Sequence, residues 1–132
     1  MTSMTLSDGA VTGATRTWLK AEGLSVLTLS LLLYRHSGSS WWMFLGLLLI
    51  PDLAMLAYLI NPKIGAVSYN VVHSYFLPLA FAASALALNR TAMLPYLLIW
   101  TAHIGMDRVL GYGLKYPQAF GRTHLGFIGK ER

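Results

Sequence analysis

The chain has 132 residues, of which 55% are hydrophobic and 11% are charged. Because a soluble domain usually carries about 25% charged residues, this composition indicates one domain whose main solvent is a lipid bilayer. The net charge of +5 comes from basic residues that stand singly at the ends of apolar segments, so it does not predict a nucleic-acid partner. The chain has no cysteine, which excludes disulfides, thiolate metal ligands and a cysteine nucleophile.

Four apolar segments predict an all-α fold, namely a bundle of four transmembrane helices. Each segment approaches the ~20 residues that cross a bilayer. The expected helices are Trp18–Tyr34, Trp41–Ile60, Ile64–Leu88 and Met93–Leu110. Pro51 and Pro78 lie inside the second and third helices and predict a kink in each. The transmembrane domain therefore covers residues 18–110.

The two ends of the chain are predicted to lie outside the bilayer. Residues 1–17 are small and polar and predict a flexible tail. Residues 111–132 contain five glycines and alternate aromatic with basic residues, which is typical of a segment at the headgroup level. Four crossings place both termini on one side, and only Arg35 and Arg90 among the basic residues stand on the other side. The positive-inside rule then predicts that both termini are cytoplasmic.

Several polar residues interrupt these apolar segments. Charged groups cost several kcal/mol at bilayer depth, so their presence needs a reason. At ~1.5 Å of rise per residue, they lie about 5 to 14 Å from the cytoplasmic ends of their helices. His103 and Asp107 are four residues apart and share a helix face, as do Asn70 and His73 at a spacing of three. The pattern predicts one shared polar site in the cytoplasmic half of the bundle.

Two imidazoles and two carboxylates form a donor set suited to a divalent metal such as zinc, manganese or iron. A bound metal would also offset the cost of burying two carboxylates. The predicted ligands are Asp52, His73, His103 and Asp107. Asn70 or Tyr69 could orient a ligand from outside this set, and His124 could fold over the cytoplasmic mouth as a fifth ligand or a general base.

Non-functional explanations of the same residues stay open. Asp107 could form an interfacial ion pair with Arg108, Lys20 or Arg16. Asp52 could be protonated and hydrogen-bonded beside the Pro51 kink. The two histidines could be neutral and serve only to hold helices together.

Longer runs of residues carry a family resemblance. They are Pro51–Tyr58, Tyr69–Tyr75, Trp100–Arg108, Gly111–Pro117 and Thr123–Gly126. Together they resemble a bacterial family of small membrane proteins labelled domain of unknown function forty-two-sixty, over nearly all of the chain from Arg16 to Gly129. The resemblance implies a multi-pass protein of the bacterial inner membrane with four helices, and it implies no activity.

A weaker similarity is to inner-membrane metal-dependent hydrolases, which carry Pro-Asp, histidines and H-x-x-x-D in separate membrane helices. This chain departs from them because it has no second histidine close to His73.

Three functions compete at this point. The first is a metal-dependent hydrolase of a lipid-like substrate, with a metal-bound water as the nucleophile. The second is a small transporter or proton-coupled carrier, which would need a homo-oligomer because four helices enclose little volume. The third is a non-catalytic membrane scaffold subunit whose polar residues hold helices together.

Overall fold

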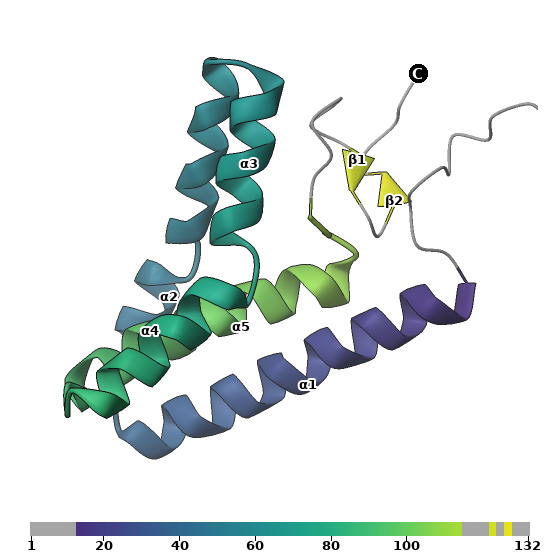
Figure 1. Cartoon of the computed structure of the whole chain (residues 1–132). Helices are drawn as coiled ribbons and strands as arrows, with labels where there is room; N and C mark the ends of the chain where they lie inside the picture. The colour runs from purple at the N-terminus through teal and green to yellow at the C-terminus, as the bar shows by residue number, and fades with distance from the viewer. Residues whose placement is uncertain (1–12, 115–121, 124–125, 128–132) are drawn as a thin grey trace, which may run out of the picture.

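A computed structural model of the chain describes residues 13–114, 122–123 and 126–127. Apart from two paired strands of two residues each, the described residues that form regular structure are helical, which confirms the all-α class (Figure 1). In chain order the elements are α1 (Gly13–Ser37), α2 (Trp41–Leu47), the 3-10 helix η1 (Ile50–Leu59), α3 (Pro62–Val72), α4 (Phe76–Ala87), the 3-10 helix η2 (Thr91–Met93), α5 (Leu94–Leu110), β1 (Arg122–Thr123) and β2 (Gly126–Phe127).

Helices α1 and α5 lie side by side (Figure 1). Glycines let them approach closely: a Cβ atom on Gly105 would stand only 2.7 Å from the carbonyl oxygen of Gly23 and 2.8 Å from the backbone nitrogen of Leu27. Close backbone approach at small residues is a common way to pack helices in membranes. One hydroxyl pair, Ser30 with Thr101 at 2.7 Å, adds a hydrogen bond between the same helices.

An aromatic cluster fixes the turn from α1 into α2. Tyr34 is fully buried, and its hydroxyl donates to the carbonyl of Ser40 at 2.6 Å. Its ring lies 5.0 Å from that of Trp41 and 5.1 Å from that of Phe44. The side chain of Ser40 accepts from the backbone N–H of Trp42 and so caps α2.

The single helix expected over Trp41–Ile60 is α-helical only in its first part. It continues as the 3-10 helix η1 from Ile50. Pro51 stands in the first turn of η1, where its missing N–H has no intrahelical partner to lose. The irregularity expected at Pro51 is therefore present, and it takes the form of a change of helix type.

The helix expected over Ile64–Leu88 is broken in two. Residues 73–75 separate α3 from α4, and the two are bent by 40°. The kink predicted at Pro78 is wrong, because Pro78 lies in the first turn of α4, where proline is tolerated. The expected fourth helix, Met93–Leu110, matches η2 and α5 to within two residues and ends at Gly111, whose φ of 88° is the left-handed cap that glycine favours.

The 3-10 helix η1 and helix α3 pair as a hairpin, in which the ring of Tyr58 lies against Gly65. This hairpin projects away from α1, α4 and α5 (Figure 1). The described residues include one helical stretch, Trp41–Leu59, that is long and apolar enough to cross a membrane, and the bent α3–α4 pair would make a second.

Candidate metal centre

Four polar side chains meet where the base of the hairpin contacts α5. Asp52 comes from the first turn of η1 and His73 from the residue that ends α3. His103 and Asp107 come from one face of α5, at a spacing of four residues. The four residues expected from the sequence to meet in one site therefore do lie together.

The distances that involve the two imidazole nitrogens of this four-residue cluster are short, and the two carboxylates lie within 4.8 Å of one another. The Nε2 atoms of His73 and His103 are 3.1 Å apart, and Oδ1 of Asp52 lies 3.1 Å from each of them. Oδ2 of Asp107 lies 3.2 Å from Nε2 of His103 and 3.6 Å from Nε2 of His73. Ligands at roughly 2.0–2.1 Å from a tetrahedral zinc ion lie roughly 3.3–3.4 Å from one another. The cluster is thus already close to the spacing that a single ion would impose.

The cluster is closed on most sides and open on one. The side chains of His73 and His103 are fully buried, and that of Asp107 is 9% exposed. The side chain of Asp52 is 34% exposed. Any exchange of water or substrate at the cluster must therefore take place beside Asp52.

The ring of His73 is held in one orientation by Tyr69. Its Nδ1–H donates to the carbonyl oxygen of Tyr69 at 2.9 Å, since a carbonyl can only accept. The two rings are stacked with centroids 3.7 Å apart and planes 9° apart. With the proton on Nδ1, the lone pair of Nε2 points into the cluster, which is the arrangement usual for metal-ligating histidines. Asn70, also expected near the site, is half-buried on α3 and is not one of the four clustered residues.

The convergence of acceptors gives the cluster its chemistry. The lone pair of His73 faces two carboxylate oxygens and a second imidazole nitrogen. Buried acceptors that face one another are costly unless a cation or a proton lies between them. The cluster could therefore hold one metal ion, or it could share protons among its members.

Of the alternatives left open by the sequence, the pairing of Asp107 with Arg108 is not the arrangement found. Within the described part of the chain, the ion pairs of Asp107 are with His73 and His103. Arg108 instead donates to two backbone carbonyls, those of His73 at 2.8 Å and Tyr112 at 3.0 Å. Asp107 thus faces the cluster and not Arg108.

Sequence reasoning missed two residues that support the site. Arg108 and Trp100, both on α5, donate to the last carbonyls of α3: Arg108 to His73, and the Trp100 indole N–H to Val72 at 2.7 Å. These bonds satisfy backbone groups that the helix end leaves unpaired. No local signal in the sequence indicates these hydrogen bonds, because they form only where α3 ends, and the hydropathy pattern shows no break between α3 and α4. The predicted general base, His124, lies outside the described residues.

Comparison with known proteins identifies the family and no more. The family model described as "Domain of unknown function (DUF4260)" matches residues 16–128, so the chain belongs to this family. Neither a curated protein nor a solved structure matches the chain.

Proposed function

We propose that this member of the DUF4260 family is a membrane-embedded, metal-dependent hydrolase with one divalent cation at the four-residue cluster. The observation that carries the proposal is the convergence of two imidazole nitrogens and two carboxylate oxygens, all within 4.8 Å of one another. Zinc suits this mixed nitrogen and oxygen set: His73, His103 and Asp107 would hold the ion, and a water beside Asp52 would take the fourth position. Manganese and iron bind the same donors when water completes their coordination.

The exposed surface supports the membrane part of the proposal. Large apolar side chains face outward on several elements, among them Leu59 at 85%, Trp42 at 83% and Phe76 at 75% exposure. A protein surrounded by water rarely leaves so many exposed. Together with the charge bias of the loops, this supports four crossings of the inner membrane, cytoplasmic termini and a site in the inner leaflet half.

Hydrolysis would take place at the open side of the cluster. A divalent metal held there would lower the pKa of a bound water to about 7. The proton that this water loses as its oxygen bonds to the carbonyl or phosphoryl atom of the substrate would pass to a carboxylate. Asp52, the most exposed member, is placed to accept this proton and return it to the leaving group as the bond to that group breaks. His124 is a second candidate for this role.

The direct test is elemental analysis of detergent-purified protein. The wild type should carry about one divalent ion per chain, and a His103→Ala, Asp107→Ala variant should carry almost none. His36→Ala is the matched control, because His36 is an exposed histidine at the end of α1. A wild type with only traces of metal after growth in metal-supplemented medium would refute the proposal, as would full retention in the double variant.

The direct contact between His73 and His103 favours one competing function, a proton-coupled carrier. A chain of carboxylates and imidazoles in hydrogen-bond contact can relay protons. A carrier should show pH-dependent uptake in proteoliposomes that Asp52→Asn abolishes, with no bound metal. A scaffold subunit should show only a lower melting temperature in the same variants.

A further inference from the structure

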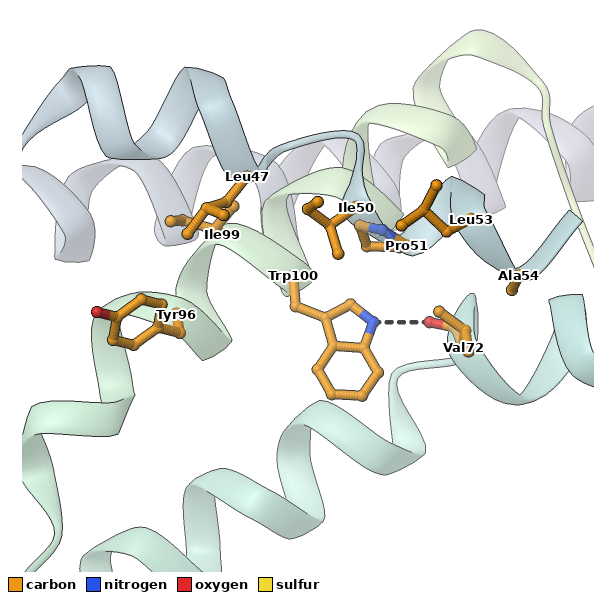
Figure 2. A pocket seen from close by; sticks show the side chains of 9 residues that line it. All are labelled: Leu47, Ile50, Pro51, Leu53, Ala54, Val72, Tyr96, Ile99 and Trp100. Atoms are coloured by element: carbon orange, nitrogen blue, oxygen red, sulfur yellow. Dashed lines mark hydrogen bonds between the residues drawn. The ribbon is translucent and has the colours of Figure 1, made fainter. Parts of the chain in front are cut away.

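A cavity of about 640 Å³ lies beside the four-residue cluster, between α2–η1 and α5. Its lining side chains form a row in Figure 2, with Tyr96 and Leu47 at one end, Val72 and Ala54 at the other, and Trp100 between them. The volume lies within the range of about 300–1,000 Å³ that is usual for small-molecule sites. An elongated cavity of this kind suits a narrow, extended occupant.

None of the four cluster residues lines the cavity, but the lining includes their immediate neighbours in the chain. Pro51 and Val72 line the cavity, and the residues that follow them, Asp52 and His73, belong to the cluster. Ile99 also lines the cavity and stands four residues before His103, on the same face of α5. A molecule in the cavity would therefore have one end beside the cluster.

The lining is almost wholly hydrocarbon. The one polar atom of Trp100 is already engaged, because the indole N–H donates to the carbonyl of Val72 at 2.7 Å (Figure 2). The remaining lining is mostly aliphatic and includes Leu53, Ile50 and Leu47. Apart from the Tyr96 hydroxyl at one end, such walls offer no hydrogen bonds to a sugar or a peptide, and they favour an alkyl chain.

The length of the cavity can be measured along α5. Tyr96 stands seven residues before His103 on α5, which corresponds to about 10 Å along the helix axis. Tyr96 is 54% exposed, so this end of the cavity opens at the protein surface. In the proposed orientation that surface faces lipid, and a chain could enter sideways from the bilayer.

We propose that the substrate is an amphiphile with one unbranched alkyl chain in this cavity and its polar, hydrolysable group at the four-residue cluster. This inference rests on the proposed function, whose substrate class it names. The residues that a long chain would reach are those at the far end of the row, Leu47 and Tyr96.

The test is photolabelling of the full-length, zinc-loaded protein in detergent. The probes are n-alkyl hydroxamic acids, whose heads chelate zinc and whose chain ends carry a diazirine, in a series from butyl to decyl. Labelled residues are identified by peptide mass spectrometry. The shorter probes should label residues near Trp100, and the longer ones should label Tyr96 and Leu47.

Variants at the far end sharpen the test. Leu47→Trp should abolish labelling of Tyr96 by the long probes and leave labelling by the short probes unchanged. Leu45→Trp is the matched control, since Leu45 is on the same helix, 62% exposed and outside the cavity lining. Zinc content and the labelling pattern of this control should match those of the wild type.

The outcomes separate this inference from the proposed function. Bound zinc with labels spread over exposed leucines such as Leu56 and Leu59, at every chain length, would overturn the alkyl site and leave the metal centre standing. Labelling whose position depends on probe length, in a protein without bound zinc, would support the alkyl chain site and refute the hydrolase. Spread labels without zinc would overturn both.

Discussion

Gly105 links the packing of α1 and α5 to the geometry of the four-residue cluster. It lies between two cluster members, two residues after His103 and two before Asp107. A Cβ atom at this position would meet the carbonyl oxygen of Gly23 at 2.7 Å and the backbone nitrogen of Leu27 at 2.8 Å. Both atoms belong to the backbone of α1 and cannot rotate away, so Gly105→Ala must separate the two helices.

The size of the effect follows from these distances. Ordinary contact with a Cβ begins at 3.4 Å, so the helices must part by 3.4 − 2.7 = 0.7 Å. Overpacking of this kind lowers the free energy of unfolding by about 1–3 kcal/mol. Replacing glycine by alanine within a helix raises it by about 1 kcal/mol, because alanine has the higher helix propensity. The net loss of stability is then about 0–2 kcal/mol. Helix α1 supplies no cluster residue, so metal binding responds to the part of the shift that α5 takes up, which moves His103 and Asp107 relative to Asp52 and His73. Metal sites tolerate distance errors of about 0.2 Å, and a displacement beyond this should weaken metal binding by about 10- to 100-fold.

Thermal unfolding and zinc titration of purified protein measure the two effects separately. Gly46→Ala is the matched control, because a Cβ on Gly46 meets no atom within 4 Å and the substitution should stabilise α2 slightly. Gly105→Ala should lower the melting temperature relative to Gly46→Ala and bind zinc more weakly. Equal melting temperatures and equal zinc affinities for the two variants would refute the reasoning.

Further substitutions test single bonds and the donor set. Trp100→Phe keeps a six-membered aromatic ring and loses the pyrrole ring with its bond to the Val72 carbonyl, and the lost bond should cost about 0.5–1.5 kcal/mol of stability; Trp42→Phe, at an 83% exposed position, should cost nothing measurable in the same unfolding assay. Ser30→Ala removes the hydrogen bond to Thr101 and should lower stability by about 0.6 kcal/mol, the mean for such bonds in a membrane protein, measured by unfolding in detergent. Zinc affinity should fall as the pH drops below about 6.5, where free imidazole gains a proton, because both histidines must be neutral to bind metal; a flat profile between pH 7.5 and 5.5, measured by competition with a chelator dye, would contradict imidazole ligation.

The meeting of Asp52, His73, His103 and Asp107 could be predicted from the sequence alone. The reasoning needed only two physical facts: ionisable groups are costly in hydrocarbon, and residues three or four apart share a helix face. Their depths along separate helices then placed them at one level. Their role as metal ligands stays a prediction.

The course of the second and third apolar segments could not be predicted in the same way. Hydropathy gives the length of an apolar run, but it carries no record of where backbone hydrogen bonds are interrupted inside that run. Pro51 correctly predicted the irregularity in the second segment. Pro78 predicted a kink five residues after His73, the C-cap residue of α3, so the break in the third segment was misplaced. The true break depends on tertiary partners, the side chains of Trp100 and Arg108, that compensate the exposed carbonyls.

The break between α3 and α4 and the four-residue cluster have a common cause. An unbroken helix through residues 73–75 would bond the His73 carbonyl within the helix and leave the guanidinium of Arg108 without this acceptor. Because the helix ends at His73, α5 supplies both the donor for the His73 carbonyl and two cluster members that face the His73 ring. The same ending of α3 separates the hairpin from α4, and the 3-10 helix η1 of this hairpin brings Asp52 to within 3.1 Å of both imidazoles. In the proposed membrane setting such an interruption of an apolar helix is costly, and in this structure the interruption is what assembles the site.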